Sequence, residues 1–134
     1  MMGWHFTDEF EELRFGDGRK IKVGITHTVD CEPILCQQGL HASKTVFDAL
    51  REAPGTILHR VRLEGKIVHG KDKSAATSRT YLARIDAGPI LKEWKKRWWV
   101  AQSQSAAAGW AFRKNQAAIM EKMVMDAMKQ KAHA

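Results

Sequence analysis

The chain has 134 residues and a formal net charge of +7, and 44% of its residues are hydrophobic while 28% are charged. This composition is typical of one globular domain with a core of its own, and it excludes a disordered chain. No run of about 18 apolar residues is present, and the acidic N-terminal segment does not resemble a secretory signal. We therefore expect a cytoplasmic protein without a membrane span.

The positive charge is distributed unevenly along the chain. Lys and Arg number 22 against 15 Asp and Glu. The acidic residues gather in segment 7–13, whereas the basic residues gather in segment 92–99 and in the C-terminal tail. An excess of this size favours polyanionic partners such as nucleic acid or nucleoprotein, and a solvated basic surface is the alternative.

The two cysteines, Cys31 and Cys36, lie on either side of Pro33. Their spacing matches neither a redox C-x-x-C motif nor half of a zinc site, so we expect no metal and no cofactor. The simplest interpretation is two small side chains near a strand. A disulfide in an oxidising compartment, or zinc ligation together with His27 and His41, is the alternative.

The first expected elements are short strands and turns. In segment 13–24, the Gly-Asp-Gly sequence at 16–18 predicts a hairpin or a tight loop. Ile21 and Val23 alternate with lysines, which is the period of a half-buried strand. A short extended piece is then expected to end at Gly39.

A short helix is predicted over residues 43–53. Ser43 has the side chain of an N-cap residue, and the Pro-Gly pair at 54–55 is expected to end the helix. Three apolar residues share one face of this helix: Val46, Phe47 and Leu50.

Two longer strands are predicted at 56–70 and 78–86. A polar turn is expected between them, over residues 70–77. In the first strand, alternation places four side chains on one face: Ile57, His59, Val61 and Leu63.

The chain becomes helical in character from Ile90 onward, where it is rich in Ala and contains no Pro. A division into two helices is expected near residues 103–105 or at Gly109, and a single kinked helix is the alternative. One apolar stripe consists of Leu91, Trp94 and Trp98. A second stripe consists of Ala117, Met120, Val124, Ala127 and Met128.

These elements predict an α+β fold in one domain spanning residues 1–134. Residues 1–89 form a strand-rich portion, with a small and mainly antiparallel sheet and one short helix. Residues 90–134 form a helical portion that covers a face of the sheet.

An ordered series of motifs runs through the middle of the chain. Cys36 is followed by the sequence Gly-Leu-His-Ala-Ser at 39–43, and a short helix then ends at Pro54. A strand of the form R-V-x-L-x-G occupies 60–65, and a D-K-x-x-A-T-x-R segment occupies 72–79. In this order the motifs resemble a family of uncharacterised proteins common in phages, prophages and bacteria.

The resemblance covers about residues 3–128 and extends to the helical end of the chain, "GWAFRKNQAAIMEKMV". Relatives carry long Ala- and Trp-rich helices before this end, and the present chain has a shortened version of them. The family has no established activity, so the resemblance implies a phage-type protein without naming its reaction.

An enzyme, or a sensor for a nucleotide-like ligand, is one functional interpretation. It uses His41 as a general acid or base, with Ser43 beside it and Glu64 as a carboxylate. At the level of the fold, the loop, helix and strand around His41 are similar to a segment of ADP-ribosyltransferase-like folds. In those folds this segment supports a dinucleotide. The residues expected to meet a phosphate are Ser43, Arg60, Lys73 and Arg79. Against this interpretation, the sequence contains no set of nucleophile, base and orienting group.

His41 also has a purely structural interpretation, which we favour. It completes the turn that leads into the short helix, with its ring half buried and bonded to the backbone.

The second functional interpretation is binding through the basic, Trp-containing segment. Lys95, Lys96 and Arg97 are expected to meet phosphates or acidic groups, and Trp99 supplies stacking or anchoring area. Trp94 and Trp98, one helical turn apart, are expected to pack on the sheet.

The sequence favours a small basic accessory protein of phage type that binds and masks a host macromolecule. The expected partner is a host protein, a nucleic acid or a nucleoprotein such as a CRISPR effector, met in the cytoplasm of the host cell, and no membrane partner is expected. Catalysis is left undecided. A third interpretation is a scaffold that forms a homodimer through its C-terminal helices.

Overall fold

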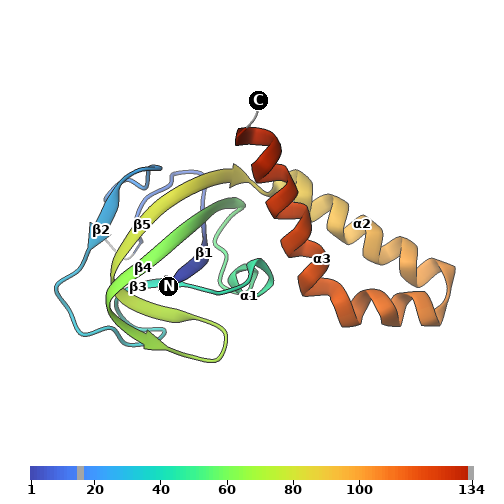
Figure 1. Ribbon diagram of the computed structural model, residues 1–134, viewed down its shortest axis with the longest axis horizontal. Helices are drawn as coiled ribbons and strands as arrows, with labels where there is room; N and C mark the ends of the chain where they lie inside the picture. Colours follow the sequence, from blue (N-terminus) through green and yellow to red (C-terminus); the bar gives the residue numbers. More distant parts are fainter. Residues whose placement is uncertain (15–16, 133–134) are drawn as a thin grey trace.

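The computed structural model describes residues 1–14 and 17–132 of the chain. It contains a mainly antiparallel five-stranded sheet, one short helix beside it and two long helices at the C-terminal end (Figure 1). The predicted α+β class is therefore confirmed.

A long hairpin forms the centre of the sheet. Its strands are β4 (Ile57–His69) and β5 (Ser74–Asp86), which pair antiparallel along most of their length. β1 (Met2–Thr7) pairs with the outer edge of β4, and two short strands, β2 (Thr26–Thr28) and β3 (Leu40–Ala42), pair with different parts of β5. Every pairing is antiparallel.

Strand β5 begins earlier than its sequence indicates. Residues 74–76 were expected to lie in a polar turn, but they pair with β3 and β4 and are buried. The expectation is wrong because Ser74 and its two alanine neighbours are small enough to pack between two adjacent strands. The turn is confined to residues 70–73, where the Gly70 N–H donates to the Lys73 carbonyl at 2.8 Å.

Two irregularities bend the central hairpin. The register shifts between Arg60 and Val61 and again between Glu64 and Ile67. Gly65 lies in the second shift with a φ of +78°, and a Cβ atom there would lie 2.2 Å from the Thr77 hydroxyl oxygen. Only glycine fits this position without strain, and bulges of this kind increase the twist of a strand pair.

Apolar residues are buried on both faces of the sheet. One cluster includes Trp4, Phe6 and Leu58, and it packs against the two helices α1 (Val46–Leu50) and α3 (Ala106–Ala132). The other cluster lies on the opposite face and consists of Ile21, Ala42, Val61, Leu63, Ala76 and Tyr81. The predicted face of β4 holds for His59, Val61 and Leu63, and Leu58 is equally buried on the other side.

Helix α1 is shorter than predicted and begins later. Its N-cap is Thr45, whose hydroxyl accepts a hydrogen bond from the Asp48 N–H at 3.1 Å. Ser43 cannot take this role because its backbone pairs with that of Trp4 through bonds of 2.7 and 3.0 Å. From α3, the Glu121 carboxylate also accepts from the Val46 N–H at 3.0 Å.

The C-terminal region consists of two helices, α2 (Gly88–Gln104) and α3, as one of the two alternatives predicted. The extended backbone of Ser105 separates them, and its hydroxyl accepts from the Ala108 N–H at 3.0 Å. Figure 1 shows the pair extending away from the sheet, with its connecting turn at the far end.

Helix α3 covers the sheet as predicted and supplies its buried side chains. Met120 and Val124, both from the second predicted stripe, are fully buried in the cluster with Trp4. None of the 17 residues of α2, all within the described part of the chain, is fully buried, but Leu91 and Trp94 of the first predicted stripe are partly buried and pack against the same cluster. No helix of the described residues has the length and apolar character needed to cross a bilayer.

The segment before β2 forms a loop, not the predicted strand. An isolated bridge joins Glu12 to Lys20, Ile21 is buried, and Val23 is half exposed. Gly16, the first residue of the predicted Gly-Asp-Gly turn, lies outside the described residues. Backbone pairing with β5 starts only at Gly24 and Ile25, which bond to the Tyr81 backbone at 2.8 and 3.1 Å, and it leads directly into β2.

Candidate ligand-binding pocket

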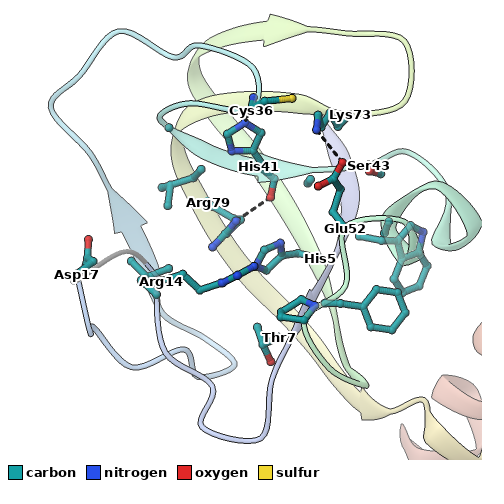
Figure 2. Close-up of a pocket in the computed structure, with 18 of the residues that line it drawn as sticks. His5, Thr7, Arg14, Asp17, Cys36, His41, Ser43, Glu52, Lys73 and Arg79 are labelled. Carbon is teal, nitrogen blue, oxygen red and sulfur yellow. Dashed lines mark hydrogen bonds and ion pairs between the residues drawn. The ribbon is translucent and has the colours of Figure 1, made fainter.

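A pocket of about 520 Å³ lies beside β1, β3 and β5 (Figure 2). Side chains from distant parts of the chain meet in it. They come from β1, from the loop before β2, from β3 and its flanking residues, from the end of α1, and from β5. The polar lining of the pocket includes the side chains of His5, Thr7, Cys36, His41, Ser43, Glu52, Lys73 and Arg79.

Arg79 is the most deeply buried charged side chain of the pocket, with an exposure of only 2%. Its Nη1 donates to the His41 carbonyl at 2.7 Å, and its Nε donates to the Tyr81 hydroxyl at 3.0 Å. No carboxylate of the described residues pairs with it. Burial lowers the pKa of the guanidinium from its usual value. A guanidinium stays protonated at neutral pH all the same, so Arg79 keeps a buried positive charge that is solvated by the neutral His41 carbonyl and Tyr81 hydroxyl.

His5 lies beside Arg79, and its ring points into the pocket (Figure 2). It reaches this position because β1 alternates, so that Trp4 and Phe6 enter the core with α3 while His5 and Thr7 lie on the other face. Burial, followed by the nearby charge of Arg79, holds the pKa of His5 well below 6.5. The imidazole is therefore neutral at pH 7 and has one donor and one acceptor nitrogen.

His41 lies on strand β3 at the wall of the pocket, where it pairs with Ala75. The prediction that His41 completes a turn before the helix is therefore wrong, but the predicted hydrogen bond between its ring and the backbone is present. The ring Nε2 accepts a hydrogen bond from the Cys36 N–H at 3.1 Å. Burial lowers the pKa of the His41 ring, which keeps this nitrogen available as an acceptor. The backbone of Cys36 is in the left-handed region, with a φ of +64°.

Lys73 and Glu52 form an ion pair at the rim, with 2.9 Å between Nζ and Oε1 (Figure 2). A hydrogen bond with the Cys36 side chain, together with that carboxylate, raises the pKa of Lys73. The lysine side chain is only 14% exposed, whereas the carboxylate is 62% exposed. The ammonium group is therefore fixed in place between the two rim residues.

Two hydroxyl groups complete the polar lining. The Thr7 hydroxyl is buried, and it makes no hydrogen bond with any described residue. Ser43 is also buried, and the pairing of its backbone with Trp4 fixes its position. A buried hydroxyl without a partner costs free energy, so Thr7 offers an unused donor and acceptor to a ligand.

A set of buried aromatic residues supports Arg79 from below. The Tyr81 hydroxyl contacts both Arg79 and the His27 Nδ1, the latter at 2.8 Å. The His59 ring packs edge-on against Tyr81, with 5.6 Å between the ring centroids. Burial lowers the pKa of His59 to about 4. His59 is therefore neutral at pH 7, and its 3.5 Å approach to the Glu11 carboxylate is not an ion pair there.

The pocket brings together four residues that the sequence singled out: His41, Ser43, Lys73 and Arg79. Two others lie elsewhere. The Arg60 guanidinium lies 4.5 Å from the ring centroid of Trp4, on the other face of the sheet. Glu64 is exposed and pairs with Arg62 at 2.8 Å, so it is not the carboxylate of this pocket.

The basic residues near the C-terminus form no part of the pocket. Lys95, Lys96, Arg97 and Trp99 all lie on α2, which extends away from the sheet. Sequence reasoning missed His5, Thr7 and Glu52. The alternation in the sequence Trp-His-Phe-Thr at 4–7 is a signal that identifies the first two as neighbours on one strand face.

The arrangement suits ligand binding more than covalent catalysis. The His41 Nε2 already accepts the Cys36 N–H, and the Ser43 hydroxyl has no hydrogen bond to a ring nitrogen of the described histidines. In the part of the chain that the structure describes, no group of three His, Cys, Asp or Glu residues is placed to hold a metal ion. The pocket offers instead a buried guanidinium, a neutral imidazole and an unpartnered hydroxyl.

Comparisons with protein-family models, with curated proteins and with solved structures found no match to this chain. The chemistry of the pocket is therefore the guide to its ligand.

Proposed function

We propose that the protein binds a small phosphate-bearing ligand of the nucleotide class in this pocket. The observation that carries the proposal is the buried Arg79, whose charge no carboxylate of the described residues offsets. A phosphate oxygen at this position would form the charge-assisted bond that the neutral partners of Arg79 cannot supply. Its Nε and Nη1 are bonded within the protein, whereas Nη2 makes no hydrogen bond to a described residue and is available to the ligand.

The carboxylates that also line the pocket do not oppose an anion at its inner end. Glu12 pairs with Lys20, Asp17 pairs with Arg19 at 2.8 Å, and Glu52 pairs with Lys73. Asp8 accepts a hydrogen bond from the Phe10 N–H at 3.0 Å. The rim is thus close to electrically balanced, whereas the inner end around Arg79 stays positive.

Size and lining favour a ligand larger than a free phosphate ion. A volume of about 520 Å³ is in the usual range for small-molecule pockets. Apolar side chains occupy the wall beside the polar groups, among them Leu13, Val29, Leu40 and Pro54. A nucleoside phosphate has the required combination of one anionic end and one flat, weakly polar end.

Calorimetric titration with AMP, ADP and ADP-ribose, each compared with inorganic phosphate, tests the proposal. We expect at least one nucleotide to bind more tightly than phosphate, and Thr7→Val to weaken it about five-fold through loss of one hydrogen bond. His5→Asn is expected to weaken it similarly. His69→Gln changes an exposed histidine outside the pocket and serves as the matched control. Absence of binding by every nucleotide at millimolar concentration would refute the proposal.

A second candidate function is the masking of a host macromolecule by a phage-type accessory protein. It is supported by one observation, the exposure of the indoles of Trp99 and Trp110, each 65% exposed on the helical pair. Exposed indoles of this kind are enriched among the residues that anchor binding surfaces. A pull-down of host proteins and nucleic acids tests this candidate. We expect the wild-type chain to retain a partner that the Trp99→Ala variant does not retain.

A further inference from the structure

A shallow groove runs between α2 and α3 on the helical pair, and it is separate from the pocket of the sheet. Its lining combines three indoles with two cations and one amide: Trp94, Trp98, Trp99, Lys95, Arg113 and Gln116. We call it the indole groove. No carboxylate among the described residues lines it.

The three indoles play different parts in the groove. Trp94 is held firmly, because its Nε1 donates to the Gln116 carbonyl at 3.1 Å and its ring packs on Phe112 with 5.7 Å between centroids. Trp98 is partly exposed and lies 6.4 Å from Trp99, centroid to centroid. Trp99 is 65% exposed. The groove thus has a fixed aromatic floor and one indole at its edge that is open to solvent.

Positive charge is concentrated on the same helices. Between residues 88 and 132 the sequence has nine Lys and Arg against three Asp and Glu, so this segment carries +6 of the formal net charge of +7. Helical spacing places Lys92, Lys95 and Lys96 on one side of α2 with Trp99. Arg97 lies on a different side, where it approaches Glu93 at 3.4 Å.

On α3 the same combination is repeated. Trp110 is 65% exposed and lies three residues before Arg113, so the two share one side of the helix. Lys114 is the next exposed cation on this side. An exposed indole with a neighbouring cation therefore occurs on both helices of the pair.

We propose that the indole groove binds single-stranded nucleic acid, with bases stacked on Trp98 and Trp99 and phosphates bound by Lys95 and Arg113. This inference rests on the second candidate function and names its partner. Stacking on exposed aromatic rings beside cations that follow the backbone is the usual means of binding single strands. In a duplex the base faces are already stacked and are not available to the indoles.

The charge of the groove argues against a second copy of this chain as the occupant. Two copies facing each other through this surface would bring Lys95 and Arg113 of one against those of the other, with no carboxylate of the described groove residues to compensate. A polyanion has the complementary charge.

The test is fluorescence anisotropy of a labelled 15-nucleotide oligo(dT), at several salt concentrations, with the full chain. We expect binding that weakens with salt, and a loss of about five-fold or more in affinity for Trp99→Ala. Lys95→Gln should reduce the slope of log affinity against log salt by about 0.7. Phe10→Ala removes an aromatic ring that is also 65% exposed, and Lys122→Gln removes an exposed cation of α3 outside the groove, so both serve as controls.

Three outcomes overturn the inference. The first is equal affinity for a duplex of the same sequence. The second is binding of poly-glutamate as tight as that of oligo(dT) and equally sensitive to Trp99→Ala, which would keep the second candidate function but make its partner an acidic protein. The third is no binding of any polyanion at a salt concentration as low as about 50 mM, where electrostatic binding is strong. This result would remove both the inference and the charge-based argument for the masking of a host macromolecule.

Discussion

The buried histidine His59 makes the stability of this fold depend on pH. Its side chain is completely buried, and neither ring nitrogen forms a hydrogen bond with a described residue. Burial lowers its pKa from 6.5 to about 4, against the opposing effect of the nearby Glu11 carboxylate. The unfolded chain therefore binds a proton at this residue at a higher pH than the folded chain does.

This difference makes the folded state less stable as the pH falls. Above pH 6.5 the histidine is neutral in both states and the fold is not penalised. As the pH falls below 6.5, the unfolded state gains a proton that the folded state refuses, so stability is lost until the folded pKa is reached. For a pKa that falls from 6.5 to about 4, the full loss is about 3 kcal/mol, and about 2 kcal/mol of it is already lost at pH 5.

Urea denaturation at pH 7.5 and at pH 5.0 measures this loss. We expect the free energy of unfolding of His59→Phe to fall by about 2 kcal/mol less than that of the wild type between the two pH values. His59→Gln also lacks a titrating ring and should show the same smaller fall, whatever its stability at pH 7.5. His69→Gln, at an exposed position, should behave as the wild type does. If both His59 variants lose as much stability as the wild type, the account of this residue is incorrect.

Two further predictions concern the packing of the fold. Met120 is fully buried between α3 and the sheet, so Met120→Ala should lower the free energy of unfolding by about 2–5 kcal/mol in urea denaturation. Met125→Ala, at an exposed position of the same helix, is the control and should cost less than about 1 kcal/mol. If Met120→Ala also costs less than about 1 kcal/mol, the packing described is contradicted. Gly65→Ala should destabilise by more than about 1 kcal/mol, because its φ is +78° and its new Cβ meets Thr77, whereas Gly24→Ala, with a φ of +94° and open space around it, should cost less.

The elements defined by local periodicity were predictable from the sequence. Strand β4 follows from the alternation of apolar and polar residues, and the helical pair follows from the Ala-rich, Pro-free sequence after Ile90. The burial of Met120 and Val124 follows from their helical spacing. In each case the pattern that predicts the element lies within the segment that forms it.

Other elements depend on contacts between distant segments, and these were missed. The extension of β5 to Ser74 requires β3 and β4 as neighbours, so the short polar-looking sequence there gives no warning. Ser43 has the side chain of an N-cap, but its pairing with Trp4 moves the helix start to Thr45. Here tertiary pairing overrides a local preference.

The candidate pocket was predictable only in part, for the same reason. His41, Lys73 and Arg79 were candidates from the sequence, and all three line one pocket. His5 is contributed by β1, and its place beside Arg79 depends on the pairing of β1 with β4. The sequence spacing between residues 5 and 79 contains no trace of this proximity.

The proposal that a phosphate-bearing ligand occupies the pocket next to Arg79 is tested by titrating ¹⁵N-labelled protein with ADP-ribose. The titration is followed through the side-chain Nε–H signal of Arg79 and the backbone amides of Thr7 and Ser43. We predict saturable shifts at these groups, with the amides of α2 unchanged. Saturable shifts confined to α2 and α3, or no shifts at millimolar ligand for ADP-ribose, ADP and AMP alike, would contradict the claim.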